Sequence, residues 1–124
     1  MTHHAPALLV VDDEVDTCRN LSDILTDLGY RVDVAHDQSA AADQLRDTAF
    51  RVVLIDMKLP HGNGAEVYRL VREANPQART VVVTGFRGEM EQRVEQVLRQ
   101  GADAVCYKPF DVGHLLTTLE RLTH

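Results

Sequence analysis

The strongest constraint on the fold is a run of branched apolar residues, Val52 to Ile55, that ends in the carboxylate of Asp56. Such a run is typical of a strand that is buried on both faces at the centre of a parallel sheet. The segment Met57 to Gly64 follows with one proline and two glycines, which predicts a loop. Asp56 is therefore expected where a buried strand meets solvent, at the edge where open α/β sheets bind ligands.

Further apolar runs along the chain predict four more strands. Between these runs, and after the last of them, apolar residues recur at helical spacing, and Gly29 and Gly101 end two of the helical segments. Five strands that alternate with five helices predict a doubly wound (βα)5 α/β fold, a flavodoxin-like three-layer sandwich. Its parallel sheet is expected to have the strand order 2-1-3-4-5. The other predicted strands are Ala7 to Val11, Arg31 to Ala35, Thr80 to Val83 and Ala102 to Tyr107.

Each predicted helix carries an apolar stripe, and three of them begin at a recognisable capping residue. Asp37 or Ser39 is expected to cap the second helix, Asn63 with Glu66 resembles a capping box for the third, and Asp111 caps the fifth. The stripes expected to face the core are Val15, Cys18, Leu21, Ile24, Leu25 and Leu28; Ala40, Ala41, Leu45 and Ala49; Val67, Leu70 and Val71; Met90, Val94, Val97 and Leu98; and Val112, Leu115, Leu116, Leu119 and Leu122.

The size and charge of the chain indicate a single domain and argue against some classes of binding partner. Its 124 residues, 44% hydrophobic, suit a single domain over residues 1–124 with a core of its own. The net charge of −6 argues against direct nucleic-acid binding and against an anionic membrane surface. Cys18 and Cys106 lack metal-binding spacing and suggest a reducing compartment. With no signal peptide and no membrane-spanning run, a cytoplasmic location is expected.

Polar residues follow each of the buried strands. Asp12 and Asp13 follow the first, Asp56 ends the third, Thr84 follows the fourth and Lys108 follows the fifth. The carboxyl ends of parallel strands meet at one edge of the sheet, so these side chains are expected to converge beside the switch point between strands one and three.

This combination of residue types favours phosphoryl transfer. Three crowded carboxylates repel one another unless a cation is bound, and Mg²⁺ prefers carboxylate, water and phosphate oxygens. Lys108 and Thr84 can each bind a phosphoryl oxygen, and one carboxylate remains to attack phosphorus and form an aspartyl phosphate.

With these residues in view, the chain resembles the receiver domains of two-component response regulators. The matching segments span nearly the whole chain in the family's order and spacing. They are Leu9 to Glu14, Val53 to Pro60 with Gly64, Val83 to Gly85, and Lys108-Pro109-Phe110.

The resemblance implies the roles of the acidic residues. Asp56 would accept a phosphoryl group from the phosphohistidine of a sensor histidine kinase or a phosphotransfer protein. Asp13 and Asp56 would ligate Mg²⁺ directly, together with the backbone carbonyl of Lys58, and Asp12 would hold a metal-bound water. The domain would be a switch and not a turnover enzyme.

The resemblance also implies an output. Thr84 and Lys108 would bind the phosphoryl oxygens and shift toward them, which reshapes the surface of the fourth helix, fifth strand and fifth helix. That surface would engage a downstream protein, a fused output domain or a second copy of the chain. Pro109 would follow a cis peptide bond. The ending of the chain suits a stand-alone receiver and an N-terminal domain equally.

One position departs from the family pattern. Receivers usually carry Tyr or Phe three residues before the lysine, whereas this chain has Val105 there and Tyr107 next to Lys108. Strand alternation puts Val105 and Tyr107 on the same face, so Tyr107 either substitutes in part or serves in packing or partner contact, which we favour. The resemblance further implies that Lys58 and Phe86 tune the access of attacking water to the aspartyl phosphate. His61, in the loop after Asp56, is a further candidate for affecting the lifetime of that phosphate.

Two other functions remain open at this stage. Val105 motivates a receiver-fold interaction module whose output does not depend on phosphorylation. The aspartate nucleophile alone would also suit a Mg²⁺-dependent phosphohydrolase, but such enzymes need a second aspartate as general acid, and position 58 is a lysine.

Overall fold

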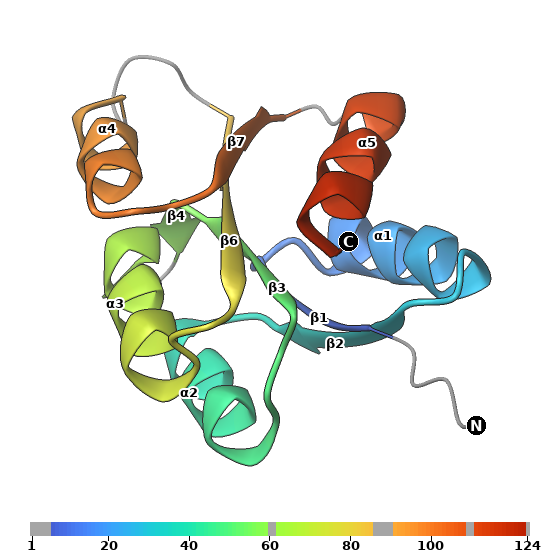
Figure 1. Ribbon diagram of the computed structural model, residues 1–124, viewed down its shortest axis with the longest axis horizontal. Helices are drawn as coiled ribbons and strands as arrows, with labels where there is room; N and C mark the ends of the chain where they lie inside the picture. The colour runs from blue at the N-terminus through green and yellow to red at the C-terminus, as the bar shows by residue number, and fades with distance from the viewer. Residues whose placement is uncertain (1–5, 60–61, 86–90, 109–110, 124) are drawn as a thin grey trace.

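The protein is described here from a computed structural model, in which residues 6–59, 62–85, 91–108 and 111–123 are placed. Its centre is a five-stranded parallel sheet with the order β2-β1-β3-β6-β7 (Figure 1). Counted along the chain within this sheet, the order is 2-1-3-4-5, as predicted. The strands are β1 (Ala7–Val11), β2 (Arg31–Ala35), β3 (Val52–Asp56), β6 (Arg79–Thr84) and β7 (Ala104–Tyr107).

Helices cover both faces of the sheet and complete a three-layer sandwich (Figure 1). On one face lie α1 (Val15–Asp27) and α5 (Val112–Thr123), and on the other lie α2 (Gln38–Asp47), α3 (Gly64–Ala74) and α4 (Glu91–Arg99). The flavodoxin-like α/β fold predicted from the sequence is therefore confirmed.

The alternation of side chains along the strands gives the molecule two separate cores. Leu8 and Val10 of β1 pack with α1 and α5, whereas Leu9 and Val11 pack with the helices of the opposite face. The central strand β3 is buried along its whole length, as the apolar run Val52 to Ile55 predicts.

The predicted helix caps at Asp37 and Asp111 are present, but some predicted core positions near helix ends are wrong. Asp37 caps α2 by accepting a hydrogen bond from the backbone N–H of Ala40 at 2.7 Å, and Asp111 accepts one from the N–H of His114 at 3.1 Å. Other predicted core positions prove to be exposed, because the terminal turns of a helix extend past the sheet. These are Val15 and Leu28 at the two ends of α1, Leu98 near the end of α4, and Val112 at the start of α5. Ala49 is also exposed, because α2 ends at Asp47 before reaching it.

The segment after Asp56 is more ordered than the predicted loop. Lys58–Leu59 (β4) and Gly62–Asn63 (β5) pair as a short antiparallel ribbon, and α3 begins directly afterwards. In this pair Lys58 lies opposite Asn63 and Leu59 lies opposite Gly62, so their backbone groups are within hydrogen-bonding reach.

Several sequence predictions fall on residues outside the described part of the chain. They concern Pro60, His61, Phe86, Met90, the Lys108–Pro109 peptide bond and Phe110. Within the ranges described, no helix combines the length and apolar character needed to cross a bilayer.

Candidate functional site

The register of the sheet brings the polar strand ends together. Val11 lies opposite Ile55 in the β1–β3 pair, so the next residues along the two strands, Asp12 and Asp56, are neighbours. In the β6–β7 pair Thr84 lies opposite Tyr107, which places Lys108 one step beyond the end of the sheet. The backbone N–H of Lys108 then donates to the Thr84 carbonyl at 2.9 Å.

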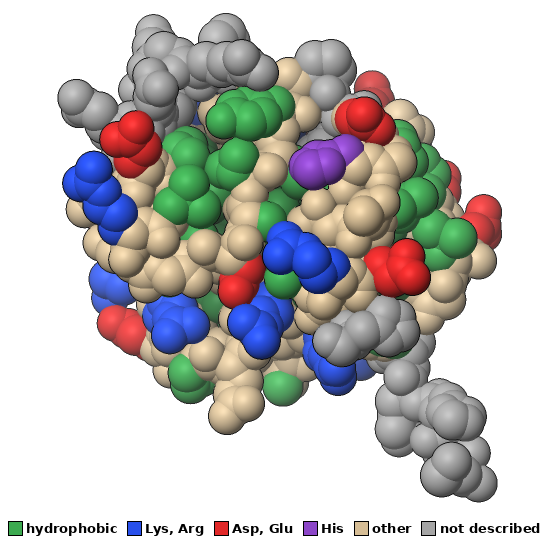
Figure 2. All heavy atoms as spheres, turned by 45° about the horizontal axis from the view of Figure 1, so that its top comes forward, with side chains coloured by type: hydrophobic (Ala, Val, Ile, Leu, Met, Phe, Trp, Pro, Cys, Tyr) green, Lys and Arg blue, Asp and Glu red, His purple; other side chains and the backbone are tan. Residues whose placement is uncertain are grey.

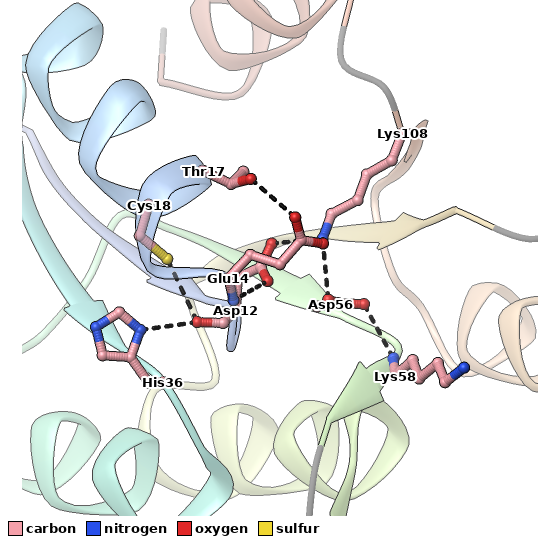
Figure 3. A network of polar contacts seen from close by, with 8 residues as sticks. All are labelled: Asp12, Glu14, Thr17, Cys18, His36, Asp56, Lys58 and Lys108. Atoms are coloured by element: carbon pink, nitrogen blue, oxygen red, sulfur yellow. Dashed lines mark hydrogen bonds and ion pairs between the residues drawn. The ribbon is translucent and has the colours of Figure 1, made fainter.

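The ammonium of Lys108 lies among three carboxylates (Figure 3). Its Nζ is 2.8 Å from Asp12 Oδ2, 2.8 Å from Glu14 Oε1 and 3.1 Å from Asp56 Oδ2. The Thr17 hydroxyl donates to the other oxygen of Glu14 at 3.1 Å. Burial alone would lower the pKa of Lys108, but its hydrogen bonds and charge contacts with the carboxylates raise that pKa well above its ordinary value. Lys108 is therefore a permanent cation in this site.

Asp56 is a buried carboxylate in an unfavourable environment for charge. Its side chain is only 8% exposed, and this burial raises its pKa from 3.8 to about 6. The backbone N–H of Lys58, which donates to Asp56 Oδ1 at 3.0 Å, and the charge of Lys108 oppose the increase, whereas the charge of Asp12 adds to it. A further cation at this edge would therefore be bound favourably.

Asp12 is fixed through its backbone as well as its side chain. Its Oδ1 accepts the backbone N–H of Glu14 at 3.0 Å, and its carbonyl oxygen accepts the thiol of Cys18 at 3.3 Å. His36 Nδ1 lies 3.0 Å from the same carbonyl (Figure 3). A carbonyl can only accept, so Nδ1 is the protonated nitrogen of that ring.

The acidic side chains match the donor set of a hard divalent cation. Carboxylate oxygens of Asp12, Asp13 and Asp56 lie within 4.8 Å of one another, and Asp13 is exposed while the other two are buried. Oxygen donors at such spacing fit Mg²⁺ or Ca²⁺, which bind few carboxylates and retain water ligands. The arrangement is a candidate divalent metal site.

A hollow of about 420 Å³ opens onto these side chains. Thr84 is 3% exposed at the end of β6, and the next residue, Gly85, borders the hollow. The residues that line it are Asp13, Glu14, Asp56, Lys58, Leu59, Gly85 and Lys108. A small anionic group therefore has room beside Asp56 and Lys108.

Three residues join the site without having been assigned to it from the sequence. Glu14 contacts Lys108, and Cys18 and His36 both contact the carbonyl oxygen of Asp12. The position of Glu14 directly after two aspartates was a signal for its role. No comparable signal marks His36, because its contact with Asp12 joins residues 24 positions apart.

The family model of the response regulator receiver domain matches residues 8–120, which include the whole constellation. The chain belongs to this family. The receiver is 32% identical over 121 residues to the transcriptional regulatory protein ZraR of Escherichia coli, a match that covers 98% of this chain and 27% of ZraR. It thus spans about a quarter of the length of that relative.

Solved structures resemble the receiver over nearly its whole length. A CheY-like response regulator receiver domain protein from Methanospirillum hungatei is 29% identical with a TM-score of 0.86, and the match covers 95% of this chain and 94% of that one. A response regulator from Burkholderia pseudomallei is 27% identical with a TM-score of 0.84, over 92% and 66% of the two chains. That structure holds a phosphorylated aspartic acid, a calcium ion and citrate.

Proposed function

We propose that this receiver accepts a phosphoryl group on Asp56 from the phosphohistidine of a sensor histidine kinase or a phosphotransfer protein. The observation that carries the proposal is the position of Asp56, a buried carboxylate at the end of the central strand. Lys108 lies 3.1 Å from it, and two further aspartates lie beside it.

In this reaction an oxygen of Asp56 attacks phosphorus, and the P–N bond of the donor breaks with its electron pair remaining on the imidazole nitrogen. Lys108 supplies positive charge to a phosphoryl oxygen, and the Thr84 hydroxyl donates a hydrogen bond to another. The chain positions the groups and neutralises charge, which is most of what phosphoryl transfer requires.

Asp13, Asp56 and the backbone carbonyl of Lys58 would hold Mg²⁺ directly, and Asp12 would hold one of its water ligands. Bound Mg²⁺ would offset the carboxylate charges and bind a phosphoryl oxygen. The spacing of the three carboxylates and the raised pKa of Asp56 support this assignment.

We further propose that residues 1–124 form one receiver domain that acts as a switch and not as a turnover enzyme. Free, buried thiols at Cys18 and Cys106 support a reducing, cytoplasmic location.

The output would run through α4, β7 and α5 to a downstream protein, a fused output domain or a second copy of the chain. Figure 2, which turns this side of the molecule forward, shows apolar side chains exposed on it, and Leu98, Tyr107 and Val112 are among the exposed apolar residues. The domain itself would not bind nucleic acid or membrane.

The test is the intact mass after incubation with acetyl phosphate, with and without Mg²⁺. We expect the gain of one phosphoryl group that requires both Mg²⁺ and Asp56, so that Asp56→Asn gains none. Equal uptake by the wild-type protein and by Asp56→Asn would refute the assignment of Asp56.

One observation favours a second candidate, an interaction module whose output does not follow phosphorylation. Val105 packs against the core on the α4 side of the sheet, while Tyr107 is 45% exposed. A partly buried aliphatic side chain that packs against the core supports a packing role at the position where the family usually carries an aromatic residue.

A further inference from the structure

The ammonium of Lys108 has no hydrogen-bond donor to spare. It carries three N–H groups, and three carboxylates, those of Asp12, Glu14 and Asp56, lie within 2.8 to 3.1 Å of its nitrogen. While Asp56 is still a carboxylate, an oxygen of an incoming phosphoryl group can therefore bind Lys108 only if one of these carboxylates gives up its place.

The three carboxylates differ in how easily they can leave. Before phosphoryl transfer the side chains of Asp12 and Asp56 are both carboxylates, 4% and 8% exposed, so the loss of Lys108 at that stage would leave either of them as a buried charge without its cation. The Glu14 side chain is 57% exposed, and water can solvate it as soon as it separates from Lys108. Glu14 is thus the partner that leaves at the lowest cost.

The carboxylate of Glu14 is also fixed in position at the edge of the site by two contacts. Its Oε1 contacts Lys108, and its Oε2 accepts the hydroxyl of Thr17 in the first turn of α1. The side chain lines the same hollow as Asp56 and Lys108, and Figure 3 shows it beside the Lys108 ammonium. Its carboxylate therefore presents an anionic oxygen to Lys108, as a phosphoryl group does.

We propose that Glu14 is a positioning residue that occupies, on Lys108 of the unphosphorylated receiver, the place later taken by a phosphoryl oxygen. This inference rests on the proposed phosphorylation of Asp56. Glu14 acts as an internal competitor, and it leaves Lys108 as the phosphoryl group enters the site, before the transfer to Asp56. The exchange replaces one ionic hydrogen bond by another, so Lys108 stays protonated and no covalent bond changes at Glu14.

A competitor of this kind lowers the affinity of the site for phosphoryl groups. Glu14→Gln removes the charge and keeps the size of the side chain, so it should bind beryllofluoride more tightly and react faster with acetyl phosphate. Exposed ion pairs of this type correspond to a gain of about two- to fivefold. Thr17→Val, which leaves the Glu14 carboxylate less well held, should change both quantities in the same direction by a smaller factor.

The matched control is Asp16→Asn. Asp16 is an exposed acid in the same first turn of α1, and its substitution removes one negative charge near the site without removing a contact of Lys108. Affinity for beryllofluoride is measured by ¹⁹F NMR at fixed Mg²⁺, and the rate of phosphorylation by intact mass. A loosened fold lowers affinity, so a gain in affinity separates the proposed role from structural damage.

We expect Glu14→Gln to exceed Asp16→Asn in both measurements. Equal values for the two variants, or a Glu14→Gln affinity at or below that of the wild-type protein, would overturn the inference while leaving the phosphorylation of Asp56 intact. A wild-type protein that takes up neither beryllofluoride nor a phosphoryl group would overturn the proposed function, and this inference with it.

Discussion

At the scale of single residues, the electrostatic state of Asp56 has a measurable effect on stability. Its pKa is raised from 3.8 to about 6 by burial, so between these values the folded protein binds more protons than the unfolded chain. The folded state therefore loses stability from this group as the pH rises from 3.8 through about 6. Above about pH 6 the destabilisation by Asp56 is fully present.

Asp56→Asn removes this charge and keeps the shape of the side chain. In Mg²⁺-free buffer at about pH 7.5 we expect it to raise the thermal midpoint by about 4 °C, or ~1 kcal/mol for a domain of this size. The increase should shrink as the pH falls toward 4, because the wild-type Asp56 then becomes protonated. Thermal unfolding followed by circular dichroism across this pH range measures the difference.

The control for this prediction is Asp16→Asn, which removes a charge from an exposed position on α1. An Asp56→Asn protein no more stable than the wild type at neutral pH would contradict the view that Asp56 is a strained carboxylate.

At the scale of secondary-structure elements, the start of α3 limits what the end of β3 can do. A Cβ added at Gly64 would lie 2.6 Å from the carbonyl oxygen of Asp56 and 2.7 Å from Cα of Met57. Both neighbours are backbone atoms of the segment that carries the Asp56 carboxylate, so they cannot move away by rotating as a flexible side chain could. The glycine lets α3 approach the strand end closely.

Gly64→Ala should therefore destabilise the fold by about 2 kcal/mol, since overpacking of a tightly packed contact has costs of this size. The displacement should also slow phosphorylation of Asp56. Chemical denaturation and the mass assay measure the two effects.

Gly85→Ala is the matched variant at the same edge of the sheet. Among the residues that the structure describes, a Cβ there meets only the Lys108 Cβ, at an ordinary 3.7 Å, so the stability of this variant should stay close to that of the wild type. Equal loss of stability in the two variants would show that the close approach at Gly64 is not the cause.

The elements themselves could be predicted because their signals are local. The apolar run Val52 to Ile55 and the cap at Asp37 each act within a few residues, and the structure has the expected strand and helix there. The exposure of Val15 and Leu28 could not be predicted from periodicity alone, because it depends on how far α1 extends beyond the sheet. The β4–β5 ribbon likewise depends on backbone pairing that no side-chain pattern records.

The candidate site likewise has a part that could be predicted from the sequence and a part that could not. The strand-end residues could be placed at one edge because parallel topology requires it. The contacts of Glu14 with Lys108 and of His36 with Asp12 could not, since they join positions 94 and 24 residues apart whose side chains meet only in the folded molecule.

At the scale of the whole molecule, the surface of α4, β7 and α5 is the place to test the output. Leu98, Tyr107 and Val112 expose 39%, 45% and 38% of their surfaces there. If phosphorylation controls the output, beryllofluoride with Mg²⁺ should shift the protein from monomer toward dimer in sedimentation velocity. Tyr107→Ala should weaken that association about tenfold, as expected for an exposed aromatic contact at an interface.

Leu28→Ala is the control, because Leu28 is 56% exposed at the far end of α1. It should associate as the wild type does. Self-association that is the same with and without beryllofluoride, and still sensitive to Tyr107→Ala, would favour the module whose output is independent of phosphorylation.

The ion pairs of Lys108 have a consequence for how the domain is made. They connect the last strand to Glu14 and Asp56, 94 and 52 positions earlier in the chain. During synthesis the acidic residues leave the ribosome first, and their cation follows only with the final strand. Until β7 docks, burial of Asp12 and Asp56 is opposed by their uncompensated charge. Completion of the sheet and completion of the site are therefore one event, and a nascent chain cannot take up a signal before β7 has docked.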